Sequence, residues 1–140
     1  HDIFAHPANL FVASFIGTPA MNLIEAGYVG DGRFAVDGRE IRLPIERLAG
    51  RLRPGGKVTL GIRPRAFDLA SEAGPDTLGA AADIIEPMGA ETLIHMVEQG
   101  RDIRVVVDRT RRVAGGTRLH LRPRPGQVHV FDESGRRVTA

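Results

Sequence analysis

An arginine between an apolar strand and a proline is the first residue whose type and position could do chemistry. The segment Gly61-Ile62-Arg63-Pro64 is apolar up to Arg63, and the proline holds the preceding backbone in an extended conformation. A guanidinium fixed in this way could present its planar fork to a carboxylate or to an anionic ligand. A structural ion pair that closes the fold is the simpler interpretation of the same residue.

A second motif, residues 85–92, brings two carboxylates close together in the chain. Glu86-Pro87-Met88-Gly89 predicts a sharp bend between two strands, and Glu91 follows it. Two such carboxylates could act as acid and base, but the pattern indicates neither burial nor a substrate cleft. We therefore expect a bend in which one glutamate pairs with Arg63. The candidate regulatory or interface residues are Gly61, Arg63, Pro64, Glu86, Gly89 and Glu91.

Histidines raise the question of a metal site. Glu91 and His95 share one face of an expected strand and could supply two ligands. A single pair at this spacing arises often by chance, and the other histidines are scattered over the start of the chain and separate strands: His1, His6, His120 and His129. We expect half-exposed histidines and no metal site.

Signatures of catalysis and nucleotide binding are missing from this sequence. No stretch matches the phosphate-binding pattern G-x-x-x-x-G-K-[ST], and Lys57, the sole lysine, is followed by Val58. The pattern G-x-S-x-G does not occur, and the serines have no recognisable histidine and aspartate partners. We expect no catalytic residue, no cofactor-binding residue and no enzyme activity in this chain.

Composition predicts one globular domain, or one domain with a tail. The chain has 140 residues, of which 42% are hydrophobic and 26% are charged. No apolar run approaches the roughly 20 residues of a membrane-spanning helix. The absence of cysteine excludes disulfides and thiolate metal sites, so the fold depends on packing.

Charge is distributed unevenly along the second half of the chain. Residues 68–98 contain seven acidic side chains and no lysine or arginine, whereas residues 101–124 contain eight arginines against Asp102 and Asp108. Such asymmetry can mark a docking surface. The alternative is that neighbouring strands neutralise each other within the fold.

Short strands separated by turns dominate the expected structure. Asp37-Gly38 is a strong two-residue hairpin signal between residues 34–36 and 41–43. Residues 57–62 alternate as a strand, residues 71–76 form a loop, and further strands follow near 80–85, 92–97, 103–107, 119–121 and 128–130. Turns about every 8–12 residues predict a mostly β fold, either a barrel or a sandwich. A short helix precedes them, with Pro7 in its first turn and with Gly17 and Pro19 ending it.

The sequence of this N-terminal segment resembles a junction found in ATPase subunits of carbohydrate ABC importers. The family pattern P-x-N-x-F-V-A-x-F-I-G-x-P-x-M-N is matched across residues 7–22. In this family, the pattern joins the nucleotide-binding domain to a C-terminal regulatory domain. The chain therefore resembles a piece of a longer protein, with residues 1–17 as helix and linker from the missing nucleotide-binding domain and residues 18–140 as the regulatory domain.

Three further segments resemble the same family, in the same order along the chain. Residues 61–64 are similar to its G-I-R-P-E, residues 86–92 to its E-x-L-G-x-E-T, and residues 128–137 to its terminal F-D…G pattern. One residue departs from the family: Arg65 stands where the family has a glutamate. Any regulatory contact made by that glutamate is therefore in doubt here.

The resemblance implies a TOBE-type regulatory domain with an OB-fold-like β-barrel, extra strands and a short N-terminal helix. It implies a dimer-stabilising role in an importer of sugars or related solutes, with homodimer contacts through this domain and permease subunits as partners of the parent ATPase. ATP and magnesium belong to the missing ATPase domain. A regulatory protein or small ligand is a further expected partner, and the implied location is the cytoplasmic face of the inner membrane.

Two other functions compete with this interpretation. A stand-alone β-barrel could bind a small oxyanion or sugar, with Arg63 and backbone amides near Gly89 as ligands, although no anion cradle rich in serine, threonine and lysine is present. A nucleic-acid-binding barrel needs a basic groove with aromatic stacking platforms. The arginine-rich residues 101–124 contain no aromatic side chain. We therefore expect no nucleic-acid partner.

Overall fold

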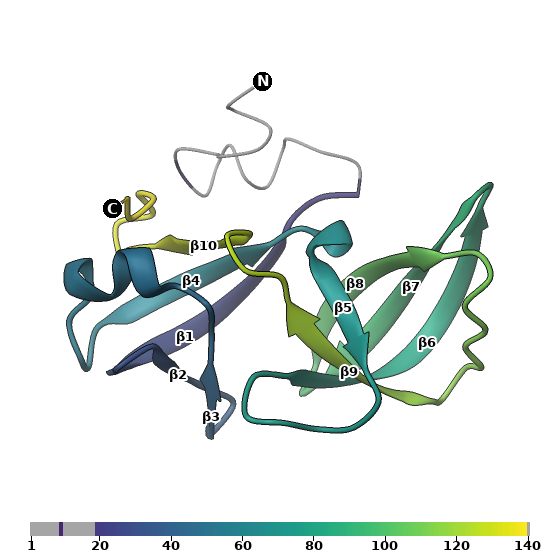
Figure 1. Cartoon of the computed structure of the whole chain (residues 1–140), viewed down its shortest axis with the longest axis horizontal. Coiled ribbons are helices and arrows are strands. Elements are labelled where there is room, and N and C mark those ends of the chain that lie inside the picture. The colour runs from purple at the N-terminus through teal and green to yellow at the C-terminus, as the bar shows by residue number, and fades with distance from the viewer. Residues whose placement is uncertain (1–8, 10–18, 140) are drawn as a thin grey trace.

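Two five-stranded antiparallel sheets form the body of the computed structural model, which describes Asn9 and residues 19–139 (Figure 1). The first sheet has the order β10-β4-β1-β2-β3, and the second has the order β5-β9-β6-β7-β8. The expected N-terminal helix lies outside the described residues. The first sheet contains β1 (Asn22–Gly30), β2 (Arg33–Val36), β3 (Arg39–Arg42), β4 (Lys57–Ile62) and β10 (Val128–Phe131). The second contains β5 (Phe67–Ala70), β6 (Leu78–Met88), β7 (Glu91–Glu98), β8 (Arg101–Asp108) and β9 (Arg118–Pro123).

Short helical elements join some of these strands. A 3-10 helix, η1 (Glu46–Arg51), follows β3. A second, η2 (Pro64–Ala66), lies between β4 and β5. Within the residues that the structure describes, no helix has the length and apolar character needed to cross a membrane.

The hairpin at Asp37-Gly38 is confirmed. Strands β2 and β3 pair with Val36 opposite Arg39, and both turn residues have positive φ, 51° at Asp37 and 77° at Gly38. Two successive positive φ values match the right-handed twist of the flanking strands. The turn between β7 and β8 repeats this conformation at Gln99 and Gly100.

Strand β4 occupies the position that its alternation predicted. Val58, Leu60 and Ile62 are buried in the core, whereas Lys57 is exposed. This strand is paired on both sides, with β1 and with β10 near the end of the chain. The expected last core strand around Val128 is therefore confirmed. It forms one edge of the first sheet, although it lies about 70 residues after β4 in the sequence.

The expected bend at residues 86–89 was placed too early. Strand β6 continues through Glu86 and Pro87 to Met88, and the chain turns only at Gly89 and Ala90. Strand β6 pairs with β9 only over Leu78–Ala81, so near Pro87 the side of β6 that faces away from β7 has no hydrogen-bonded strand. Proline is tolerated there because no backbone hydrogen bond is lost.

One hydrophobic core joins the two sheets. Ile24, Phe34 and Leu60 of the first sheet belong to the same buried cluster as Ile94 and Leu121 of the second. Hydrogen bonds also cross between the sheets: the side chain of Asn22 contacts Arg104 of β8. The two sheets therefore form one packed body.

Candidate functional site

Gly61 is a packing position in β4. A Cβ atom there would lie 2.5 Å from the sulfur of Met21 and 2.8 Å from the ring of Phe131. Both neighbours are buried, with 3% of Met21 and 0% of Phe131 exposed. The glycine therefore allows β4 to lie directly against these two side chains.

Arg63 and Pro64 have the backbone conformation that the motif predicted. Arg63 is extended, with φ −66° and ψ 147°, and Pro64 begins η2 with its ring buried. Partial burial lowers the pKa of the Arg63 guanidinium, although arginine remains charged in proteins. The proline thus turns the chain out of the first sheet and toward β5.

Each glutamate of the second motif has its own basic neighbour. Glu91 accepts two hydrogen bonds from Arg65, at 2.8 Å and 3.3 Å, in a bidentate pair. Glu86 lies 3.0 Å from the Nε2 atom of His95. The expected partner for one of these glutamates was Arg63. The side chain that joins the two motifs is instead Arg65, the residue that departs from the family pattern.

The Arg65–Glu91 pair also sets the protonation of both groups. The hydrogen bond from Arg65 is the main reason that the pKa of Glu91 lies below its ordinary value, and the same bond raises the pKa of Arg65. Both side chains are about half exposed. The pair therefore holds Glu91 ionised at neutral pH, which suits an electrostatic contact better than proton transfer.

Gly89 has a structural role in the β6–β7 turn. Its φ is +75°, a conformation that glycine adopts without steric cost. A Cβ atom there would meet nothing within 4 Å, so the backbone, rather than crowding, requires the glycine. The candidate residues thus fall into two groups. Some have packing or turn roles, whereas Glu91 and Glu86 belong, with Arg65, to an exposed, charged surface.

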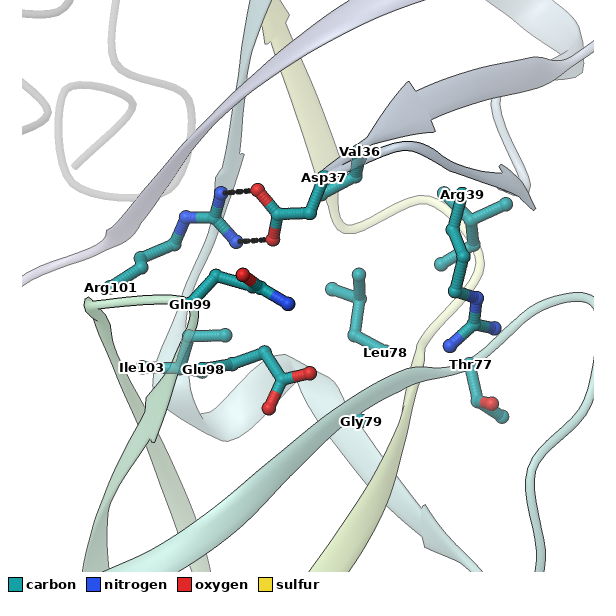
Figure 2. A pocket seen from close by; sticks show the side chains of 11 residues that line it. Val36, Asp37, Arg39, Thr77, Leu78, Gly79, Glu98, Gln99, Arg101 and Ile103 are labelled. Atoms are coloured by element: carbon teal, nitrogen blue, oxygen red, sulfur yellow. Dashed lines mark hydrogen bonds and ion pairs between the residues drawn. The ribbon is translucent and has the colours of Figure 1, made fainter.

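A more enclosed polar site lies between the sheets and was not found from the sequence. Arg101 donates hydrogen bonds of 2.8 Å and 2.7 Å to the two carboxylate oxygens of Asp37 (Figure 2). These side chains are only 21% and 27% exposed. They border a cavity of about 70 Å³, with Arg39 and Gln99 on opposite sides of it in Figure 2.

The turn at Asp37-Gly38 was predicted from the sequence, but its proximity to the turn at Gln99 was not. Asp37 and Gln99 each occupy a tight hairpin turn with positive φ, and 64 residues separate Asp37 from Arg101. Next to them, Arg118 holds Glu98 in a second bidentate pair. That hydrogen bond is the main cause of the lowered pKa of Glu98.

Internal pairing accounts for much of the uneven charge in the second half of the chain. Arg118 pairs with Glu98, Arg122 with Asp76 and Arg124 with Asp68. These contacts favour mutual neutralisation of neighbouring strands over a single docking stripe. Among the residues that the structure describes, no group of three or more histidine, cysteine, aspartate or glutamate side chains could hold a metal ion.

Comparison with protein families divides the chain into two overlapping parts. Residues 17–67 match the model described as the MalK OB fold domain. Residues 60–131, half of the chain, match the model described as the TOBE domain. The chain belongs to the TOBE domain family. The predicted mostly β, OB-like fold is thereby confirmed.

Several curated proteins are similar to this TOBE chain over nearly its whole length. The sn-glycerol-3-phosphate import ATP-binding protein UgpC of Escherichia coli strain K12 is 38% identical over 139 residues, which cover 98% of the chain and 38% of that protein. UgpC 1 of Rhizobium johnstonii is 35% identical, covering 93% and 35%. The diacetylchitobiose uptake ATP-binding protein MsiK of Streptomyces coelicolor is 34% identical, covering 99% and 41%. The TOBE chain thus spans well under half the length of each relative.

A solved structure supports the fold independently. The cytoplasmic molybdate-binding protein ModG superposes with a TM-score of 0.63 and 13% sequence identity, covering 78% of this chain and 94% of its own. At that identity the similarity concerns the fold alone.

The two family matches locate the charged contacts within the TOBE chain. They overlap at residues 60–67, which contain Gly61, Arg63, Pro64 and Arg65. Asp37 lies in the first matched region and Arg101 in the second. Their ion pair therefore connects the two regions, beside the cavity of Figure 2.

Proposed function

We propose that this chain is the regulatory C-terminal part of the ATP-binding subunit of an ABC importer for sugars or related solutes. The observation that carries the proposal is the match to import ATP-binding proteins over 93–99% of the chain, in only 35–41% of their length. The remaining part of such a subunit would bind ATP and magnesium. The TOBE chain itself would carry no catalytic group.

The regulatory mechanism follows from binding equilibria. Two subunits of an importer ATPase close around nucleotide and open after hydrolysis. A TOBE domain that contacts its counterpart in both arrangements keeps the subunits together, and a ligand or protein that binds one arrangement better shifts the balance between them. The packed body formed by the two sheets supports such a role, because a rigid domain transmits a contact made on one sheet to the other. Permease subunits would hold the assembly at the cytoplasmic face of the membrane.

The first test is the coding sequence upstream of His1. A phosphate-binding loop, an L-S-G-G-Q-type signature and an acidic magnesium-binding strand end in the same frame would identify the parent as an importer ATPase. A reading frame that encodes none of these would refute the assignment and leave a free-standing ligand-binding barrel as the leading function.

The second test addresses the dimer. The full-length subunit and a version lacking residues 18–140 are compared by light scattering in nucleotide-free buffer, with ATP-bound samples as the reference. We expect the full-length subunit to stay dimeric without nucleotide and the truncated version to dissociate. Equal dissociation of both proteins would exclude a dimer-stabilising role for the TOBE domain.

A further inference from the structure

The cavity of Figure 2 lies where two hairpins approach the start of β6. The β2–β3 hairpin contributes Asp37 and Arg39, the β7–β8 turn contributes Gln99, and residues 77–79 lie between them. We call this feature the hairpin cavity. Its volume is about 70 Å³, and one water needs about 10–15 Å³ of such space. The cavity therefore has room for a ligand of only a few non-hydrogen atoms.

The backbone of Gly79 directs its N–H and C=O toward the hairpin cavity. Both backbone groups of Ala82 bond to residues 116 and 117, on the β9 side of β6. Backbone groups alternate between the two sides of a strand, and the register with β9 is regular, so Gly79 faces the side of β7. The β6–β7 ladder begins only at Ala81 and Val97. Beside Gly79 there is therefore no paired strand, only the cavity that it lines.

These two backbone groups are buried and available. Gly79 is buried in the fold, and neither its N–H nor its C=O has a partner among the residues that the structure describes. Buried backbone groups in native proteins are almost always paired, with protein, water or ligand. A polar group that occupies the hairpin cavity would supply the missing partner.

Two polar side chains border the same space from opposite sides. In Figure 2 the guanidinium of Arg39 lies on one side of the cavity and the amide of Gln99 on the other. Neither side chain makes a hydrogen bond or an ion pair with any described residue. Together with the N–H of Gly79, they supply hydrogen-bond donors from three directions.

The charges around the hairpin cavity favour an anion. Arg101 pairs with Asp37, and Arg118, next to Gly79, pairs with Glu98. Each pair has two hydrogen bonds, so both carboxylates already have a cationic partner. The guanidinium of Arg39 has no such carboxylate and leaves the cavity with one positive charge in excess. A cation would have no free carboxylate to bind.

We propose that the hairpin cavity binds a small planar oxyanion that carries one hydroxyl group, such as bicarbonate. The planar fork of Arg39 matches two oxygens of such an anion. The N–H of Gly79 and the amide N–H of Gln99 would donate to the same oxygens, and the hydroxyl of the ligand would donate to the C=O of Gly79. This proposal does not depend on the importer assignment.

The proposed ligand would contact both sheets at once. Arg39 begins β3 of the first sheet, whereas Gly79 and Gln99 belong to β6 and to the β7–β8 turn of the second. A ligand that binds the folded chain and not the unfolded chain stabilises the fold as its concentration rises. Binding would therefore raise the unfolding temperature, in addition to changing the environment of these three residues.

Nuclear magnetic resonance titration of the 140-residue chain tests the proposal. The probe is bicarbonate at slightly alkaline pH, with chloride used to hold the ionic strength constant. We expect saturable shifts at millimolar bicarbonate for the amide of Gly79, the side-chain amide of Gln99 and the Nε–H of Arg39. Nitrate is the matched control anion, because it has the same planar shape and charge but no hydroxyl, and we expect it to bind at least tenfold more weakly.

Two variants on different hairpins make the test specific. Arg39→Gln removes the unmatched positive charge, and Gln99→Gly removes the amide while keeping a residue that suits the positive φ of this turn. We expect each to weaken bicarbonate binding, Arg39→Gln at least tenfold. Arg53→Gln is the matched control, because Arg53 is also exposed and has no ion pair with a described residue, but it lies outside the cavity. It should leave the binding unchanged.

Several results would overturn the proposal. Absence of a saturable shift at Gly79 would show that the cavity holds only ordered water, and so would equal shifts in wild type and Arg39→Gln. Equal weakening by Arg53→Gln would mean that bicarbonate acts through overall charge. Equal binding of nitrate would contradict the bond from the ligand to the Gly79 carbonyl. If one of the two variants fails to fold, the other decides.

Discussion

The side-chain amide of Asn22 binds both backbone polar groups of Arg104, 82 residues away in the sequence. Its Nδ2 atom donates to the Arg104 carbonyl at 2.8 Å, and the Arg104 N–H donates to its Oδ1 atom at 2.8 Å. The same Nδ2 atom also donates to the carbonyl of Ile62 at 3.1 Å. One buried amide thus replaces a strand partner at the edge of β8 and connects the two sheets.

Removing this amide should destabilise the whole body. We expect Asn22→Ala to lower the free energy of unfolding by about 1–3 kcal/mol, because the partly buried backbone groups of Arg104 lose their partner. Urea unfolding followed by circular dichroism measures the change. Gln127→Ala, which removes an amide from an exposed turn, is the control and should change stability by less than about 0.5 kcal/mol. Equal effects of the two substitutions would contradict the role of Asn22.

Gly61 and Gly27 offer a matched pair on neighbouring paired strands. A Cβ atom at Gly61 would collide with Met21 and Phe131, whereas a Cβ atom at Gly27 would meet nothing within 4 Å. We expect Gly61→Ala to cost about 1–3 kcal/mol through overpacking. Gly27→Ala should be neutral or slightly stabilising, because alanine restricts the unfolded chain. Thermal unfolding of both variants checks this, and a stable Gly61→Ala protein would show that Met21 moves aside freely.

The sequence predicted the elements better than the contacts between them. Local signals were sufficient for the Asp37-Gly38 hairpin and for β4, because turn conformation and alternating burial depend on neighbouring residues. The bend near Pro87 was misplaced because tolerance of a proline depends on whether a partner strand lies beside it, which only the assembled sheet decides.

Side-chain partners were the least predictable feature. The motifs at residues 61–64 and 86–92 were found, but Arg65 rather than Arg63 contacts Glu91. The Asp37–Arg101 pair joins the β2–β3 turn of the first sheet to the start of β8 in the second sheet. Partners so far apart in sequence meet only through the packing of the two sheets, and a single sequence carries no direct signal for that proximity.

The Asp37–Arg101 pair should contribute more than an exposed pair of the same kind. Its side chains are 21% and 27% exposed, compared with 41% and 53% for Arg33–Glu40. We expect a double-mutant cycle with Asp37→Asn and Arg101→Gln to give a coupling of about 1 kcal/mol or more, because burial strengthens the bidentate contact. Asparagine suits the positive φ of Asp37, so the turn is preserved.

The comparison cycle uses Arg33→Gln and Glu40→Gln on the same hairpin. Exposed pairs typically contribute about 0.2–1 kcal/mol, so the coupling there should be the smaller of the two. Chemical denaturation of all variants supplies both values. A coupling for Asp37–Arg101 no larger than that for Arg33–Glu40 would mean that the two sheets are held by the core alone.

The Arg65–Glu91 pair makes a pH-dependent contribution whose sign follows from the pKa of Glu91. The hydrogen bond from Arg65 lowers this pKa below its ordinary value of 4.5 in the folded chain. A carboxyl with a lowered folded pKa stabilises the protein above its unfolded pKa, and this contribution is lost as the pH falls through the folded pKa. Wild type should therefore lose stability below about pH 4.5 partly through Glu91.

Replacing the arginine isolates that contribution. In Arg65→Gln, we expect the pKa of Glu91 to rise toward its ordinary value, because the first cause of its shift is removed. The stability difference from wild type should be largest at neutral pH and vanish at low pH, where Glu91 is protonated in both proteins. Titration of the Glu91 carboxyl carbon by nuclear magnetic resonance measures the shift. Arg111→Gln, which lines the same surface hollow as Arg65 but does not act on Glu91, should leave the titration unchanged. An unaltered Glu91 pKa in Arg65→Gln would show that Arg65, where the family pattern has a glutamate, is not what holds this carboxylate ionised.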